Sequence, residues 1–110
     1  IGNIIIDKYA NMCIFSYILM EVDMLDEYAN KFKAIGHPVR LRIVMGLAKK
    51  ECNVTKICEG LGLPQATISR HLALLRNLGI VEGVRDGHEI CYSLVDDKIA
   101  KIVDLLMEEE

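Results

Sequence analysis

The sequence has no tryptophan, few aromatic residues of any kind (5%) and only two prolines in 110 residues. None of its four cysteines forms a CxxC pair, which excludes a zinc ribbon and a thioredoxin-type redox motif. The apolar run at residues 12–20 is too short to cross a bilayer and lacks a basic leader, so neither a membrane span nor a secretory signal is expected. We therefore expect a cytoplasmic protein with reduced thiols.

The usual signatures of catalysis are also missing. The sequence shows no nucleophile–base arrangement, no glycine-rich phosphate loop and no paired carboxylate site. Its three histidines form neither an HxxH nor an HExxH spacing, and His71 is expected to be a packed, hydrogen-bonded residue. The sequence therefore does not predict an enzyme.

The sequence is rich in aliphatic residues and uneven in charge. It is 52% hydrophobic with a formal net charge of -3, which argues against a protein held to nucleic acid by bulk charge. Residues 31–50 nevertheless contain six basic residues and no acid, whereas residues 1–30 and 96–110 each carry a net charge of -4. We expect one domain, a basic face built from its middle, and apolar surface buried against a second subunit.

The N-terminal part is predicted to be helical. Apolar residues recur at spacings of three and four over residues 4–35, as one long helix or two shorter ones, and Gly36 ends this stretch. Pro38 suits the first turn of the next helix, whose apolar stripe continues through Ala48. Met24 is an alternative start of the natural chain.

Two more helices follow, separated by a tight turn. The first runs from about Val54 to Leu61, with Asn53 as its N-cap, and the turn reads LGLP. Pro64 opens the second, which Gly79 closes. Its core-facing stripe consists of Ile68, Leu72, Leu75 and Leu78.

A hairpin and a last helix complete the chain. Strands are predicted at Ile80–Arg85 and at about His88–Leu94, with Asp86-Gly87 as the two-residue turn. The last helix begins at Asp96 or Asp97 and runs to about Met107. The fold class is therefore mainly α with a small β-hairpin, in the order α-α-α-α-β-β-α, which is a winged helix-turn-helix.

The predicted division is a single winged-helix domain over residues 1–110. It comprises an N-terminal helical extension (1–24), the helix-turn-helix (53–78), the wing (80–94) and a dimerisation helix (96–107). This order of elements is typical of proteins that place a helix in the major groove of DNA.

The second helix of the helix-turn-helix has the side chains that DNA recognition requires. Gln65, Thr67, Ser69 and Arg70 lie away from its apolar stripe and can pair with base edges or phosphates. No acid lies between Glu59 and Glu82, which suits contact with phosphate. Arg76 is predicted to contact phosphate, and the candidate wing contacts are Arg85 and His88.

The stretches FKAIGHPVRLRIVMGL and ICEGLGLPQATISRHLALLRNLGIVEGVRDGHEICYSL resemble the ArsR/SmtB family of bacterial and archaeal repressors. The resemblance covers about Tyr28 to Leu106. It implies a homodimer with the first and last helices at the interface, and a double-stranded DNA operator with an inverted repeat. It also implies release from DNA when an inducer binds, often a metal ion or a thiol oxidant.

The family's two usual metal sites are not reproduced. Asn53 and Thr55 stand where the resemblance places a Cys-x-Cys pair, and neither supplies a thiolate. In the last helix Asp96 matches the first ligand of the other site, but Lys98 replaces a histidine. The residues therefore fix no metal or cofactor, and a soft metal ion or metalloid at cysteine thiolates stays open.

The cysteines are the remaining candidates for an inducer site. Cys52 follows two lysines and precedes a helix, which favours thiolate, so it is the first candidate sensor thiol and Cys13 is its candidate partner. Cys58 is expected to be structural, and Cys91 to be partly accessible on the wing. Two alternatives to an inducible repressor stay open: a winged-helix module for protein–protein assembly and a non-inducible repressor.

Overall fold

The structure is a computed structural model that describes residues 13–20 and 22–108, and the chain divides into two units, residues 1–30 and 31–110. The first unit contains α2 (Ile14–Met20) and most of α3 (Val22–Ile35), which continues into the second. The predicted helical stretch 4–35 thus forms two helices, and its part before residue 13 lies outside the described residues. The single-domain division of the chain stays a prediction.

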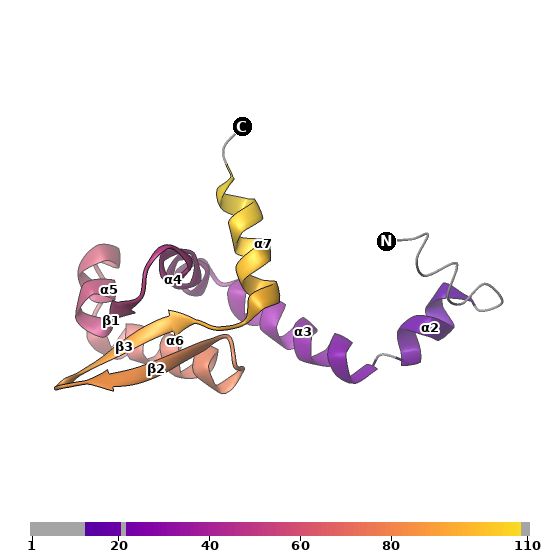
Figure 1. The fold of residues 1–110 in the computed structure, drawn as a ribbon, viewed down its shortest axis with the longest axis horizontal. Helices are drawn as coiled ribbons and strands as arrows, with labels where there is room; N and C mark the ends of the chain where they lie inside the picture. Colours follow the sequence, from indigo (N-terminus) through magenta and orange to yellow (C-terminus); the bar gives the residue numbers. More distant parts are fainter. Residues whose placement is uncertain (1–12, 21, 109–110) are drawn as a thin grey trace. The chain divides into compact units, whose positions relative to one another are not determined.

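The second unit contains a small sheet and the remaining helices. Its elements are α4 (Pro38–Lys49), β1 (Cys52–Asn53), α5 (Val54–Leu61), α6 (Gln65–Asn77), β2 (Val81–Asp86), β3 (Glu89–Leu94) and α7 (Asp97–Met107). The hairpin of β2 and β3 lies beside α6, as Figure 1 shows. In the part of the chain that the structure describes, no helix is long and apolar enough to cross a membrane. The predicted fold class, mainly α with a wing, is confirmed.

The sheet has three antiparallel strands in the order β1–β3–β2, one more than predicted. Cys52 pairs with Tyr92 and Asn53 with Cys91. The segment before α5 is therefore not a free connection, because its last two residues are bound to the wing. A two-residue strand has no periodicity of its own, so its pairing with a strand some forty residues later could not be seen in the sequence.

The hairpin turn lies one residue further along than predicted. The ladder continues to the pair Asp86–Glu89, so the two loop residues are Gly87 and His88. Gly87 has a φ of 66°, which only glycine adopts freely at the first position of a two-residue hairpin loop. The glycine therefore located the turn correctly, but Asp86 is the last strand residue.

Local side-chain and backbone hydrogen bonds define the helix ends. The Asn53 side chain accepts from the Lys56 N–H at 2.9 Å, which confirms Asn53 as the N-cap of α5. The Asp96 carboxylate accepts from the Ile99 N–H at 3.0 Å and caps α7 in the same way. After α6 the chain turns at Gly79 (φ 76°), where the Ile80 N–H donates back to the Leu75 carbonyl.

The core lies between α6, the sheet, α4 and α7. Ile68, Leu72 and Leu75 are fully buried, which confirms the apolar stripe of α6, although Leu78 is only half-buried. The other buried apolar residues include Val44, Ile80, Val81, Ile99 and Val103. At roughly 25 cal/mol per Å² of apolar area, this burial is the main force that fixes α6 against the sheet. The polar face of α6 is thereby directed outward.

Candidate nucleic-acid interface

The N-terminus of α6 presents unbonded backbone donors. The preceding residue, Pro64, has an extended conformation, and no side chain of the described residues caps the helix. The first turn contains no acid. Since the first N–H groups of a helix have no partner within it, and the helix dipole favours negative charge there, this end can receive a phosphate.

The predicted DNA-reading residues are mostly accessible. Gln65, Ser69 and Arg70 are exposed, Thr67 is half-buried, and Arg76 is exposed near the helix end. The four-residue spacing of Gln65 and Ser69 puts them on one flank of α6. Their side chains can donate to or accept from base edges in a groove.

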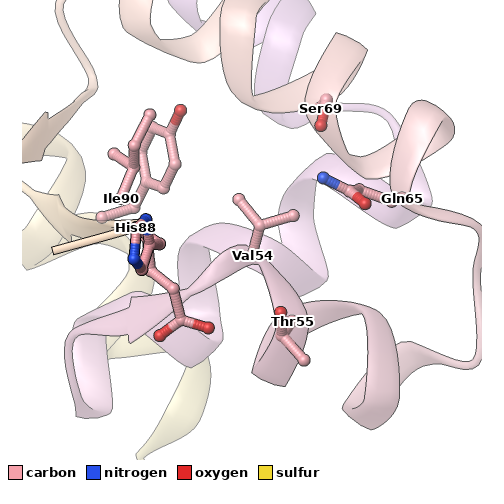
Figure 2. Close-up of a pocket in the computed structure, with 8 residues that line it drawn as sticks. Val54, Thr55, Gln65, Ser69, His88 and Ile90 are labelled. Carbon is pink, nitrogen blue, oxygen red and sulfur yellow. The ribbon is translucent and has the colours of Figure 1, made fainter. Parts of the chain in front are cut away.

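A hollow of about 220 Å³ connects this flank of α6 with the wing. Gln65 and Ser69 line it from α6, Thr55 from the first turn of α5, and His88 from the hairpin loop, as Figure 2 shows. Ile90 and Tyr92 of β3 complete its apolar side. The acid Glu89 also lines the hollow. We call the other four polar side chains, Thr55, Gln65, Ser69 and His88, the reading surface.

Three of the predicted DNA-contacting residues, Gln65, Ser69 and His88, line this hollow together, and Thr55, which was not among them, lines it too. That threonine lies in the first turn of α5, two residues after its N-cap, and is exposed. The signal available in the sequence was a hydroxyl residue at the start of the first helix of the turn motif. Thr67, Arg70, Arg76 and Arg85 do not line the hollow.

The tip of the wing carries charges of both signs. Arg85 and His88, the predicted wing contacts, are both exposed. His88 lies inside the loop and not at the start of the strand where it was predicted, and Arg85 pairs with Ile90. Asp86 and Glu89 lie opposite each other beside them. The Glu89 carboxylate accepts a hydrogen bond from Asn53 Nδ2 at 2.8 Å, which ties the wing to the start of α5. Two acids near the tip weaken its attraction for phosphate compared with α6.

The basic stretch 31–50 does not form one face, contrary to expectation. Lys31 is buried, and its Nζ lies 2.6 Å from Asp96 Oδ2. Arg40 is half-buried, and its Nε donates to the Ala34 carbonyl at 2.6 Å. A count of charges could not reveal this, because two of the six cations, Lys31 and Arg40, bind other groups within the fold. Lys33, Arg42, Lys49 and Lys50 are exposed.

A histidine pair links α6 to the start of α4. Arg40 Nη1 lies 3.2 Å from His71 Nδ1, and the His71 ring is 4.8 Å from that of His37. His37 Nδ1 accepts from the Val39 N–H at 3.1 Å and caps α4. Burial lowers the pKa of His71, and the nearby His37, Arg40 and Arg70 lower it further. The cluster therefore favours a neutral His71, which agrees with its predicted packed role.

None of the cysteines is among the residues that line the hollow beside the reading surface. Cys52, Cys58 and Cys91 are half-buried, and Cys13 is exposed. Cys13 belongs to the first unit and the other three to the second. Among residues 13–20 and 22–108, no group of three or more His, Cys, Asp or Glu side chains is arranged to hold a metal ion.

Comparison with known proteins agrees with this geometry. Residues 37–83 match the family model described as the arsR family of bacterial regulatory proteins. The transcriptional repressor PagR of Bacillus anthracis is 40% identical over 96 residues, which cover 86% of this chain and 96% of PagR. The transcriptional repressor SmtB of Mycobacterium tuberculosis is 36% identical over 81 residues, which cover 74% of this chain. The match spans 60% of the length of SmtB.

Solved structures share the fold. The crystal structure of PagR aligns with a TM-score of 0.71 at 41% identity, and covers 77% of this chain and 98% of PagR. A homodimeric winged helix-turn-helix DNA-binding domain from Mycobacterium bovis aligns with a TM-score of 0.72 at 30% identity, covering 78% of this chain and 80% of that domain. With a matching family model, a relative covered almost end to end and the same fold, the chain belongs to the ArsR family of bacterial regulatory proteins.

Proposed function

We propose that this protein is a homodimeric transcriptional repressor that binds a double-stranded DNA operator with an inverted repeat. The observation that carries the proposal is the uncapped N-terminus of α6, with Gln65 and Ser69 exposed on the flank that borders the wing. Backbone N–H groups and Arg70 contact phosphate, while Gln65 and Ser69 contact base edges. The names of PagR and SmtB as repressors support the direction of regulation.

Exposed apolar side chains support the dimer. In α7, Leu105 and Leu106 are 68% and 60% exposed. In the first unit, Ile14, Phe15, Ile18, Met24 and Leu25 are also exposed. An amphipathic helix end with two accessible leucines gains free energy when a second copy covers it. An inverted repeat then follows from the two-fold symmetry of the dimer.

DNA binding is tested by fluorescence anisotropy on the DNA upstream of the protein's own gene and on a scrambled duplex. Affinity for the upstream DNA should fall steeply as salt rises, because phosphate contacts release counterions. Gln65→Ala should cost about 1–3 kcal/mol on the upstream DNA and reduce its preference over the scrambled duplex. Arg76→Ala should weaken binding to both duplexes by a similar factor.

The matched control for these variants is Lys101→Ala on α7, which is exposed and far along the chain from α6. It should leave both affinities unchanged. Absence of binding to the upstream DNA even at low salt would contradict the proposal and favour a winged-helix module for protein–protein assembly.

We also propose that release from DNA is controlled by thiol chemistry, with Cys52 as the reactive residue and Cys13 as its partner. Cys52 is half-buried at the edge of the sheet, one residue before the N-cap of α5. Oxidation or binding of a soft metal ion at this sulfur would disturb β1 and, through Asn53, the cap of the first helix of the turn motif.

The test measures release from bound upstream DNA after treatment with an oxidant, a persulfide donor, arsenite or cadmium. Cys52→Ser and Cys13→Ser should each abolish release by at least one of these, and Cys58→Ser serves as the control. Equal release from the wild type and both variants would contradict thiol sensing at these residues. No release from any of them would indicate a non-inducible repressor.

A further inference from the structure

A second hollow lies between α4 and α5 and shares no lining residue with the one beside the reading surface. Its volume is about 220 Å³. Ile43, Leu47 and Ile57 form a buried apolar floor. It exists because α4 packs on α6, α7 and β3, while α5 packs on α6 and on strands β1 and β3. We call this space the α4–α5 groove.

Two helical glycines line the α4–α5 groove. Gly46 of α4 and Gly60 of α5 both line it, and a Cβ added at either would meet no atom within 4 Å. Neither has a positive φ, so neither conformation requires glycine. Glycine within a helix is less stable than alanine, because the unfolded chain loses more conformational freedom. Packing and backbone geometry therefore do not account for either glycine.

The rim of the groove is positively charged. Arg42 lines it from α4 and Lys56 from α5, and both are exposed. No acid is among the residues that line the groove. The Arg42 guanidinium contacts the Pro38 carbonyl at a long 3.5 Å, which leaves most of its donors for another partner. An apolar floor below two cations matches a ligand with an apolar body and one negative charge.

We propose that the α4–α5 groove binds a small aromatic carboxylate, with its ring over Ile43, Leu47 and Ile57 and its carboxylate between Arg42 and Lys56. The size fits, because an apolar cavity of about 150 Å³ holds a benzene ring. Charge-assisted hydrogen bonds from the two cations select the anion over a neutral ring.

The experiment uses the full chain without DNA, so its result is independent of the proposed repressor function. The probe is 4-fluorobenzoate, titrated by ¹⁹F NMR, with 4-fluorobenzyl alcohol as its neutral counterpart. Backbone amide spectra follow Gly46 and Gly60 during the same titrations. We expect saturable binding of the anion, shifts at both glycine amides, and binding of the alcohol that is at least about tenfold weaker.

Two pairs of substitutions test the floor and the rim separately. Gly46→Ala with Gly60→Ala places a methyl group at two lining positions and should weaken binding of the anion by about tenfold or more, while the melting temperature stays level or rises. Arg42→Met with Lys56→Met should lower the affinity for the anion by about tenfold and leave the affinity for the alcohol unchanged. The control for charge is Arg70→Met with Lys101→Met, which removes one arginine and one lysine outside the groove.

Several results would overturn the proposal. The first is that 4-fluorobenzoate shows no saturable binding in the millimolar range. The second is that the anion and the alcohol bind with equal affinity. The third is that the titration leaves the amide shifts of both glycines unchanged. Unchanged affinity in the glycine double variant would do so as well. A fall in the melting temperature of the glycine double variant would show that the groove is not open space. An equal loss of affinity in the Arg70 and Lys101 control would show that the loss comes from the change in net charge and not from the groove.

Discussion

Lys31 and Asp96 form a buried ion pair that joins the end of α3 to the start of α7, with 2.6 Å between Nζ and Oδ2. Their side chains are only 7% and 4% exposed. The same carboxylate accepts from the Ile99 N–H and caps α7. One aspartate therefore fixes both the position of α3's last turns and the first turn of the proposed dimerisation helix.

Removing one partner of this pair should be strongly destabilising. Lys31→Ala leaves the Asp96 carboxylate buried without its ammonium partner, and should lower the free energy of unfolding by about 3–5 kcal/mol. Asp96→Ala should cost at least as much, because loss of the helix cap adds about 1 kcal/mol. Urea denaturation at a fixed protomer concentration measures both, since the proposed dimerisation would make stability depend on concentration.

Lys31→Met with Asp96→Asn provides the control for this prediction. The asparagine keeps a cap acceptor, and the methionine replaces the buried ammonium with an apolar group of similar length. Because replacing both charges avoids a buried carboxylate that has lost its ammonium partner, the double variant should be more stable than Lys31→Ala. A loss below about 1 kcal/mol in Lys31→Ala, the range of exposed pairs, would show that the pair is not buried in solution.

The lowered pKa of His71 makes stability dependent on pH. Burial is the largest cause, followed by the charges of His37, Arg40 and Arg70. As the pH falls below 6.5, the unfolded chain takes up a proton at this residue before the folded chain does. Protonation therefore stabilises the unfolded state relative to the folded state. The contribution of His71 to stability is therefore complete above about pH 6.5 and is lost as the pH falls toward the lowered pKa.

Two substitutions isolate this effect. Phenylalanine at position 71 cannot titrate, so His71→Phe should remove part of the pH dependence seen in urea denaturation between pH 8 and pH 5. His37→Asn keeps an acceptor for the Val39 N–H and removes one of the charges that lower the pKa of His71. Its His71 pKa, measured by NMR, should move toward the ordinary value. Identical pH profiles in the wild type and His71→Phe would contradict the prediction.

Elements with their own periodicity could be predicted from the sequence. The α6 stripe repeats over about three turns and is followed by a glycine, and the structure buries Ile68, Leu72 and Leu75 as expected. Strand β1 could not be predicted, because two residues have no pattern and become a strand only by pairing with β3. The turn was predicted one residue too early, because glycine is compatible with either position of a two-residue loop.

The site was predicted in part for a similar reason. Gln65 and Ser69 follow from the helix period, and His88 from its place beside the turn glycine. Thr55 lies on a different helix and joins them only through packing of α5 on α6. The role of Lys31 was missed because its partner Asp96 lies 65 residues away, and a count of charges contains no information on such pairs.

The exposed leucines of α7 give a prediction on assembly. Leu105→Glu with Leu106→Glu should convert the proposed dimer into a monomer, since two carboxylates would be buried at the interface without partners. Sedimentation equilibrium measures the change in mass. Lys101→Glu with Lys98→Glu, two exposed positions on the same helix, controls for added negative charge. A dimer of unchanged affinity in the leucine variant would place the interface elsewhere.

Gly83 of β2 lies directly under two side chains of β3. A Cβ at this position would lie 2.7 Å from Ile90 Cγ2 and 2.9 Å from Tyr92 Cε1, closer than real contacts allow. Because Tyr92 is buried, its ring has little room to retreat. Gly83→Ala should therefore lower the free energy of unfolding by about 1–3 kcal/mol, as overpacking does. Val84→Ala, at a neighbouring exposed position, should change it by less than about 0.5 kcal/mol.

The same substitution should also weaken DNA binding. Ile90 and Tyr92 form the apolar side of the hollow that separates His88 from Gln65 and Ser69, so displacing them moves the wing relative to α6. Anisotropy under conditions where the variant is fully folded should show a loss of affinity that Val84→Ala does not share. Adding Ile90→Ala removes the Cγ2 contact and should restore part of both losses. If Gly83→Ala is less stable but binds DNA normally, the position of the wing does not contribute to recognition.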